Sequence, residues 1–340
     1  MARRIARCSA LIALLLAAGH GSAANFALPA GDANVVGHVL SVRLDGTRNT
    51  LLDVARHYDL GYDEIVAANP GVSIWLPGAG SRIVVPTEFV LPPKPWVGIV
   101  INVAQRRLFY FPAQRRSVVT FPIGIAQAGW PTPLGRTRII AKFRDPSWIV
   151  PEDIRAQHLR AGETNFPRYF PPGPENPMGM LAMETGFPEI FIHGTDRPWG
   201  VGMRVSYGCL HLYPEDAAYL FERLRVGTPV RIMDQPVSVG EREGRLYLSA
   251  ATPLGEHSPA RDYLTRAVRA VIRFQGLGTA SARAVDWDRV IRAAEARRIA
   301  PAPISPRRSL AVASAPLPAT NYDFAPYGVD ANDARVPATR

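Results

Sequence analysis

One cysteine and one histidine, Cys209 and His193, have the residue types of a thiol nucleophile and its base, and they stand 16 residues apart. A thiol becomes a useful nucleophile when a nearby imidazole removes its proton or stabilises the thiolate. Gly208 precedes the cysteine, and backbone N–H groups beside a glycine can approach a substrate closely enough to hold an oxyanion. We therefore expect acyl-transfer chemistry at Cys209, provided that the fold brings His193 close to it.

Two short apolar segments have to position this pair. Residues 191–192 precede the histidine and residues 210–212 follow the cysteine, and both have the composition of strand ends. If these two strand ends are neighbours, the imidazole and the thiol face each other. We therefore expect a catalytic domain that consists mainly of β-strands.

The N-terminus indicates export. Residues 1–24 combine three arginines, an apolar run over 10–18 and small residues, which is the order of a cleaved secretory signal. Cleavage would remove Cys8 and leave Cys209 as the remaining thiol, which favours reactive use over an internal disulfide.

Nucleic acid is a poor partner for an exported protein. The net charge of +10 fits contact with an acidic polymer or a membrane surface, or solubility alone.

These segments resemble the L,D-transpeptidase family, whose catalytic domain is also called YkuD. The family carries a His-Gly pair and, further on, Ser/Thr-His-Gly-Cys; here His193-Gly194 is followed by residues 206–209, Ser-Tyr-Gly-Cys. Residues 132–135, 171–177 and 227–230 are also similar to the family. The resemblance implies a YkuD-like β-sandwich with short helices, without a metal or another cofactor.

The resemblance also implies a role for each matching residue. Cys209 would be the acylated nucleophile, and His193 the base, oriented by the carbonyl group of Gly194. The N–H groups of Gly208 and Cys209 would stabilise the oxyanion, with Ser206 in a supporting position.

Two positions differ from the family's commonest pattern. Tyr207 stands where a second histidine is usual, and His211 stands where arginine is usual. A guanidinium binds a carboxylate through two parallel hydrogen bonds, which an imidazole cannot do. The resemblance therefore does not indicate how the carboxylate of the substrate is held.

The implied reaction acts on a peptidoglycan tetrapeptide stem. The thiol attacks the bond between the L-centre of meso-diaminopimelate and D-alanine, and an amine then resolves the thioester. A second stem as acceptor gives a 3→3 crosslink, a lysine of an outer-membrane lipoprotein gives protein anchoring, and water gives carboxypeptidase activity.

Residues 38–86 predict a small α+β unit in the order strand, helix, helix, strand. The stretches 49–51, 65–70 and 80–86 resemble a LysM module, which implies binding to peptidoglycan glycan. A LysM unit ahead of the catalytic domain resembles the protein-anchoring branch of the family, the ErfK/YbiS type. The alternative is a small structural cap on the next domain.

The rest of the chain divides by composition. Residues 87–96 are Pro-rich and predict a linker, since prolines cannot donate to a sheet. The catalytic domain is predicted to span 97–236, followed by an Arg-rich, partly helical extension over 237–300 and a disordered tail over 301–340. Within 97–236 we expect strands at 97–103, 107–111, 118–125, 138–142 and 229–233, and helices at 152–159 and 215–224.

Two other functions fit the same residues. His193, Cys209 and His211 could bind zinc, as in a zinc- or cysteine-dependent L,D-carboxypeptidase, although structural zinc sites usually have tightly paired ligands. The departures at Tyr207 and His211 would also fit a catalytically inactive, peptidoglycan-binding module.

The remaining histidines and three tryptophans are the last side chains considered for a part in the functional site. The histidines are expected to be surface or packing residues, because no partner pattern surrounds them: His38, His57, His158 and His257. Trp130, Trp148 and Trp199 lie in loops rich in Pro and Gly, and we hypothesise that they line the substrate cleft.

Overall fold

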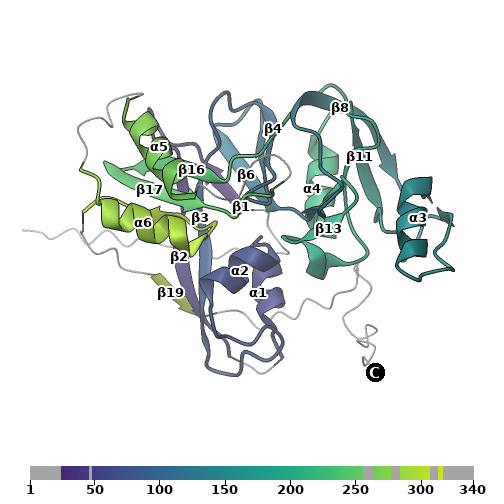
Figure 1. The fold of residues 1–340 in the computed structure, drawn as a ribbon, viewed down its shortest axis with the longest axis horizontal. Helices are drawn as coiled ribbons and strands as arrows, with labels where there is room; N and C mark the ends of the chain where they lie inside the picture. The colour runs from purple at the N-terminus through teal and green to yellow at the C-terminus, as the bar shows by residue number, and fades with distance from the viewer. Residues whose placement is uncertain (1–23, 46–47, 256–262, 277–283, 307–312, 317–340) are drawn as a thin grey trace, which may run out of the picture.

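The computed structural model describes residues 24–45, 48–255, 263–276, 284–306 and 313–316 (Figure 1). The predicted signal peptide, residues 1–24, lies outside the described residues except for Ala24. The fold consists mainly of β-strands with short helices, as the sequence predicts. Among the described residues, no helix is long and apolar enough to cross a membrane.

A nine-stranded sheet forms the centre of the molecule. Its core is aliphatic and aromatic, and helix α4 (Pro214–Arg223) adds Ala217, Leu220 and Phe221 to it. In spatial order the strands are β1 (Ala24–Ala27), β6 (Ser117–Pro122), β5 (Arg107–Phe111), β4 (Gly98–Asn102), β15 (Pro229–Met233), β8 (Gly135–Arg144), β11 (Leu181–Thr185), β12 (Phe191–His193) and β14 (Leu210–His211).

The single strand predicted over 118–125 is divided in the structure. β6 ends at Pro122, and β7 (Ile125–Ala126) pairs in parallel with β13 (Arg204–Ser206) instead of continuing the main sheet. The break lies at Gly124, which exchanges backbone hydrogen bonds with His211 on β14. The local sequence does not show this bridge, because its partner is distant in the chain.

A segment with helix α3 (Glu152–Arg160) projects from one end of the molecule, away from the C-terminal helices (Figure 1). Its base is a two-stranded sheet of β9 (Trp148–Ile149) and β10 (Tyr169–Phe170). Trp148 stacks on Phe170 with ring centroids 5.6 Å apart. A single-turn helix, η1 (Pro198–Gly200), lies between β12 and β13.

The N-terminal unit has the predicted order of elements: β2 (Val35–Arg43), α1 (Leu51–His57), α2 (Tyr62–Ala68) and β3 (Arg82–Val90). Thr50 caps α1, since its hydroxyl oxygen accepts a hydrogen bond from the Asp53 N–H at 3.1 Å and its own N–H donates to the Asp53 carboxylate at 2.7 Å. β2 and β3 pair in antiparallel fashion along their whole length. Both strands extend beyond the predicted ends.

The segment 87–96, predicted to be a linker, is packed against the molecule. Its first residues continue β3, and Leu91 is fully buried. The Trp96 ring stacks on Phe111 of β5 at 6.0 Å, and its indole N–H donates to the Pro92 carbonyl oxygen at 2.8 Å. The segment that joins the N-terminal unit to the nine-stranded sheet is therefore packed against that sheet.

The C-terminal extension contains a β-hairpin that the sequence analysis missed. β16 (Val237–Arg242) and β17 (Arg245–Ala250) are joined by Glu243 and Gly244, whose φ angles are 50° and 78°. Two successive positive φ angles are typical of a tight hairpin turn, and the Glu-Gly pair between apolar runs was the available signal. The predicted helical character is confirmed by α5 (Tyr263–Gly276) and α6 (Trp287–Ala296), which pack on this hairpin.

Two short strands fall within 301–340, the segment predicted to be disordered. β18 (Ala302–Pro303) adds to β17, and β19 (Ala313–Pro316) pairs in parallel with β2. Residues 307–312 and 317–340 lie outside the described residues.

Candidate active site

The candidate site lies where β12 and β14 run side by side in parallel. Ile192 pairs with Leu210, and His193 pairs with His211. The two imidazole rings are in contact, with centroids 4.6 Å apart. Cys209 directly precedes β14, so the parallel pairing places the end of β12, which carries His193, beside the strand that follows the cysteine.

His193 is held in one orientation and is almost fully buried, with 2% of its surface exposed. Its Nδ1 lies 2.6 Å from the Gly194 carbonyl oxygen. A carbonyl oxygen only accepts hydrogen bonds, so Nδ1 carries the proton and Nε2 keeps its lone pair in the neutral ring. Burial lowers the pKa of His193 to about 4, although hydrogen bonds to the carbonyl groups of Gly194 and Met178 oppose this shift.

Cys209 is a free thiol that remains partly exposed at the surface. Its Sγ lies 3.4 Å from the Glu189 carbonyl oxygen, in the turn that leads into β12. Removal of water from around the sulfur raises the pKa of Cys209 to about 11. At neutral pH the resting site therefore holds a neutral thiol and a neutral imidazole.

The turn before the cysteine is fixed by side-chain hydrogen bonds. Ser206 Oγ donates to the Cys209 carbonyl oxygen at 2.5 Å, and Thr132 Oγ1 donates to the Gly208 carbonyl oxygen at 2.7 Å. Gly208 has a φ of 111°, which other residues rarely adopt. Within the described part of the chain, no hydrogen bond uses the N–H of Gly208 or Cys209. Both N–H groups are therefore without an acceptor among the described residues, as the predicted oxyanion-binding role requires.

His211 differs from an arginine in charge as well as shape. Burial and the neighbouring His193 hold the pKa of His211 well below its ordinary value, so its ring is neutral. A neutral imidazole does not supply a cation for the substrate carboxylate. The half-buried ring instead packs against His193.

One residue expected to lack a partner, His158, has a specific one. Its Nε2 lies 2.8 Å from the Tyr207 hydroxyl, two residues before the cysteine. Trp130 also contacts Tyr207, edge to face at 5.1 Å, whereas Trp148 packs within the α3 segment. No local pattern predicts the His158–Tyr207 contact, because its partners are 49 residues apart in the chain.

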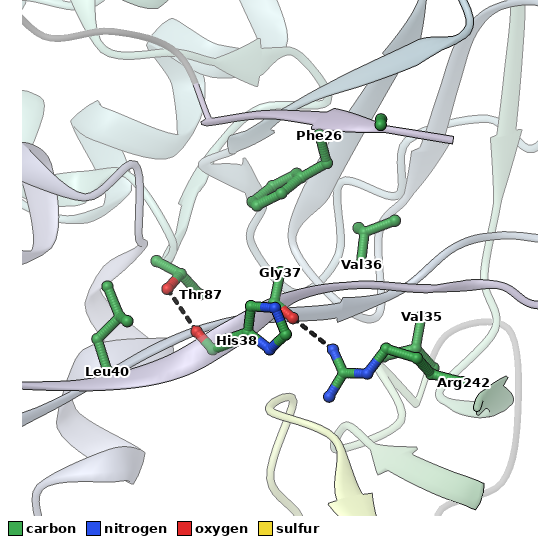
Figure 2. A pocket seen from close by; sticks show the side chains of 9 residues that line it. Phe26, Val35, Val36, Gly37, His38, Leu40, Thr87 and Arg242 are labelled. Atoms are coloured by element: carbon green, nitrogen blue, oxygen red, sulfur yellow. Dashed lines mark hydrogen bonds between the residues drawn. The ribbon is translucent and has the colours of Figure 1, made fainter. Parts of the chain in front are cut away.

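A separate pocket of about 390 Å³ lies between β1 and β2 (Figure 2). Phe26 covers one side of it, and Arg242 donates a hydrogen bond to the Gly37 carbonyl oxygen at another. His38 lines this pocket, but none of the predicted catalytic residues does. In the described part of the chain, no group of three or more His, Cys, Asp or Glu residues is arranged to hold a metal ion.

Comparison with known proteins defines the class. The model of the YkuD family, the L,D-transpeptidase catalytic domain, matches residues 97–232. This chain belongs to the L,D-transpeptidase family, as the order of motifs around Cys209 predicts.

Two relatives illustrate the similarity. The probable L,D-transpeptidase ErfK/SrfK of Escherichia coli is 36% identical over 248 residues, which cover 72% of this chain and 79% of that protein. The probable L,D-transpeptidase YbiS of Escherichia coli is 36% identical over 236 residues, covering 68% of this chain and 76% of that protein. A solved structure, that of the Cys-to-Ser variant of the Enterococcus faecium L,D-transpeptidase, is 20% identical in sequence, covers 46% of this chain and 57% of that chain, and has a TM-score of 0.31.

Proposed function

We propose that this chain is a periplasmic peptidoglycan L,D-transpeptidase that acts through a thioester on Cys209, with His193 as its general base. The observation that supports the proposal is the parallel pairing of β12 with β14, because β12 ends at His193 and β14 begins directly after Cys209. Membership of the L,D-transpeptidase family supports the reaction class.

In the first step, Cys209 Sγ bonds to the carbonyl carbon between the L-centre of meso-diaminopimelate and D-alanine. The thiol proton passes to Nε2 of His193, the lone pair left available by the Nδ1 hydrogen bond to Gly194. The carbonyl oxygen becomes an oxyanion that accepts hydrogen bonds from the N–H groups of Gly208 and Cys209. Cleavage of the C–N bond then releases D-alanine, whose amine takes the proton from His193.

In the second step, an acceptor amine attacks the thioester carbon and gives its proton to His193. The C–S bond breaks, and the proton returns to the sulfur as the thiol is restored. The acceptor that we favour is the lysine side chain of an outer-membrane lipoprotein, since the chain is similar to the ErfK and YbiS relatives and has the helical N-terminal unit ahead of the catalytic domain. The amine of a second stem is the alternative, and it gives a 3→3 crosslink.

The unit from β2 to β3 is proposed to be a LysM module that binds the glycan of peptidoglycan. The order of its elements supports this role, and its firm packing on the catalytic sheet would present both to the same wall region. Contact of the basic C-terminal region with a membrane surface remains a prediction.

Analysis of digested cell wall tests the function. Cells with the native chain are compared with cells that carry Cys209→Ala or His193→Gln, and the muropeptides are identified by mass spectrometry. We expect both variants to lose peptidoglycan-linked lipoprotein, or 3→3 dimers if the acceptor is a second stem. Binding of the Cys209→Ala chain to intact and to peptide-free sacculi tests the LysM role separately.

Unchanged crosslinks, linked protein and stem lengths would overturn the enzymatic proposal. Failure of the native chain to form a covalent adduct with a penem β-lactam would favour the inactive wall-binding module. Loss of activity on chelation, restored by zinc, would favour the metal-dependent carboxypeptidase.

A further inference from the structure

The α3 segment is attached to the turn that carries the nucleophile by a chain of three side chains. The Tyr207 hydroxyl lies 2.8 Å from His158 Nε2, and His158 Nδ1 lies 2.8 Å from a carboxylate oxygen of Glu163. Tyr207 belongs to the turn before Cys209, whereas His158 lies on α3 and Glu163 follows this helix. The contact therefore links two segments that are far apart in sequence.

The positions of the protons in the hydrogen-bonded series Tyr207–His158–Glu163 follow from the chemistry of the phenol and the carboxylate at its two ends. Burial raises the pKa of Tyr207, partly opposed by a hydrogen bond with Gln127, so its hydroxyl keeps its proton. The Glu163 carboxylate beside Nδ1 of His158 accepts a hydrogen bond, so Nδ1 carries the proton of the neutral ring and Nε2 accepts from the Tyr207 hydroxyl. The His158 ring also stacks on Phe166 with centroids 3.5 Å apart, so it cannot turn away without losing this contact.

A second connection runs parallel to the first through the loop before β8. Trp130 packs edge to face on the Tyr207 ring at 5.1 Å, and its indole N–H donates to Gln157 Oε1 on α3 at 2.5 Å. Thr132, two residues further along this loop, donates to the Gly208 carbonyl oxygen. The turn before Cys209 is thus held by α3 on one side and by this loop on another.

The orientation of this turn decides whether its N–H groups can serve an oxyanion. Gly208 has a φ of 111°, and a glycine does not restrict its own backbone to that value. The restriction has to come from neighbouring contacts. Thr132 fixes the Gly208 carbonyl group, and the anchored Tyr207 side chain fixes the peptide plane before it.

We propose that His158, supported by Glu163, is a positioning residue that holds Tyr207 and thereby sets the oxyanion-binding turn and the thiol of Cys209. The proposal rests on the proposed function, since the group that it positions is the acylated thiol. It also gives a reason for tyrosine at position 207: the phenol is long enough to reach α3 while its ring packs against Trp130.

Acylation kinetics test the role of the contact. Tyr207→Phe removes only the hydroxyl, and His158→Ala removes its partner. We expect each variant to lower the maximal rate of acylation by a penem β-lactam about tenfold, with the half-saturating concentration changed less than about twofold. Because both changes break the same contact, the double variant should be no slower than the slower single variant.

A matched pair of exposed glutamates controls for general effects on the α3 segment. Glu163 supports His158, whereas Glu152 pairs with Arg155 on the outer surface of α3, and their side chains are 59% and 81% exposed. Glu163→Gln should slow acylation by about threefold and Glu152→Gln should leave it unchanged. Both substitutions lie at the surface, so neither should prevent folding.

Several results would overturn the positioning role. These are acylation rates of Tyr207→Phe and His158→Ala within about twofold of the native rate, effects that multiply in the double variant, or a change confined to the half-saturating concentration. The native chain is measured first: absence of its Cys209 adduct overturns the proposed function. A native adduct with unaffected variants overturns the positioning role alone.

Discussion

At the scale of single residues, loss of contact with water shifts the pKa values of the proposed base, His193, and the proposed nucleophile, Cys209, in opposite directions. It lowers the pKa of His193 to about 4 and raises that of Cys209 to about 11. Both shifts favour the neutral form, so the site does not rest as a thiolate–imidazolium pair. In the proposed mechanism, proton transfer to His193 therefore accompanies attack on the substrate, as in general-base catalysis.

The pH dependence of acylation follows from this arrangement. His193 is neutral and able to act as base at every pH above about 4, so the native acylation rate should be constant between about pH 5 and 9. In His193→Gln, attack depends on thiolate formed without the base. Its rate should be lower and should rise about tenfold per pH unit over the same range.

Stopped-flow measurement of penem acylation from pH 5 to 9 checks this expectation, with Cys209→Ala as the control that forms no adduct. Parallel profiles for the native chain and His193→Gln would show that His193 is not the base.

At the scale of structural elements, the loop between β10 and β11 supports the base. Asn176, 1% exposed, donates to the Pro146 and Pro171 carbonyl oxygens and accepts from the Met178 N–H. The loop ends at Gly179, which has a φ of 64° and packs directly on the backbone of Gly194. Gly179 thus packs against Gly194, whose carbonyl oxygen accepts the hydrogen bond that orients His193.

Gly179→Ala should therefore reduce activity by more than the backbone strain of an alanine at a positive φ angle would by itself. A Cβ there would lie 2.9 Å from the Gly194 carbonyl carbon, too close to fit unless that backbone moves. We expect acylation to slow by about tenfold or more, because the orientation of the base changes. Gly227→Ala is the matched control, since Gly227 has a φ of 91° with no atom near the added carbon.

Equal acylation rates in the two glycine variants, measured at matched folded fractions, would show that the position of Gly194 does not depend on Gly179. A comparable loss of thermal stability in both is expected from backbone strain.

At the scale of the whole molecule, the N-terminal unit and the catalytic domain share one interior. A single apolar cluster includes Leu51 and Ile65 of the N-terminal unit together with Val100 and Phe109 of the main sheet. Ion pairs cross the same boundary. Arg56 binds Glu215 through two bonds of 2.7 Å, and the buried Arg107 binds Glu64 at 2.6 Å and 2.9 Å.

Two buried carboxyl groups, Asp59 after α1 and Asp216 on α4, meet at this boundary. Burial raises the pKa of Asp59 to about 7, partly opposed by Arg107, and burial with the Asp59 charge raises the pKa of Asp216 well above its usual value. The two side chains are hydrogen-bonded to each other, which requires a proton on one of them. Glu215 and Arg56 are the other titratable groups that act on Asp216.

The stability of the protein should depend on this pair. Both carboxyl groups hold their protons more tightly when folded than when unfolded, so their contribution to stability is full below about pH 4. The contribution of Asp59 is lost as pH rises through about 7, and that of Asp216 is lost as pH rises through its own raised pKa. Asp216→Asn keeps the shape of the side chain but removes its ionisable carboxyl group. Relative to this variant, the native chain should be less stable at pH 8 than at pH 5 by about 1 kcal/mol or more.

Thermal or urea unfolding of both chains at the two pH values measures the difference. A constant difference between the native chain and Asp216→Asn would show that the carboxyl pair does not titrate in this range.

Local elements and reactive residues could be predicted from the sequence to a considerable extent. Most strands and helices between 38 and 233 lie where the apolar periodicity places them, because that signal depends on near neighbours. The sequence-based prediction of secondary structure is wrong where contacts between residues distant in the chain decide the local structure. Gly124 ends a strand because it pairs with His211, and the linker at 87–96 is packed because Trp96 stacks on Phe111.

The sequence by itself determined the reactive residue types: a single thiol beyond the predicted signal, a histidine at the end of a strand and a turn with glycine before the cysteine. Only the tertiary structure decided that β12 pairs in parallel with β14, that Tyr207 is anchored by His158 and that Asp59 meets Asp216. The physical reason is that periodicity and turn chemistry are local, whereas pairing, burial and the pKa shifts that follow depend on segments brought together by the whole chain.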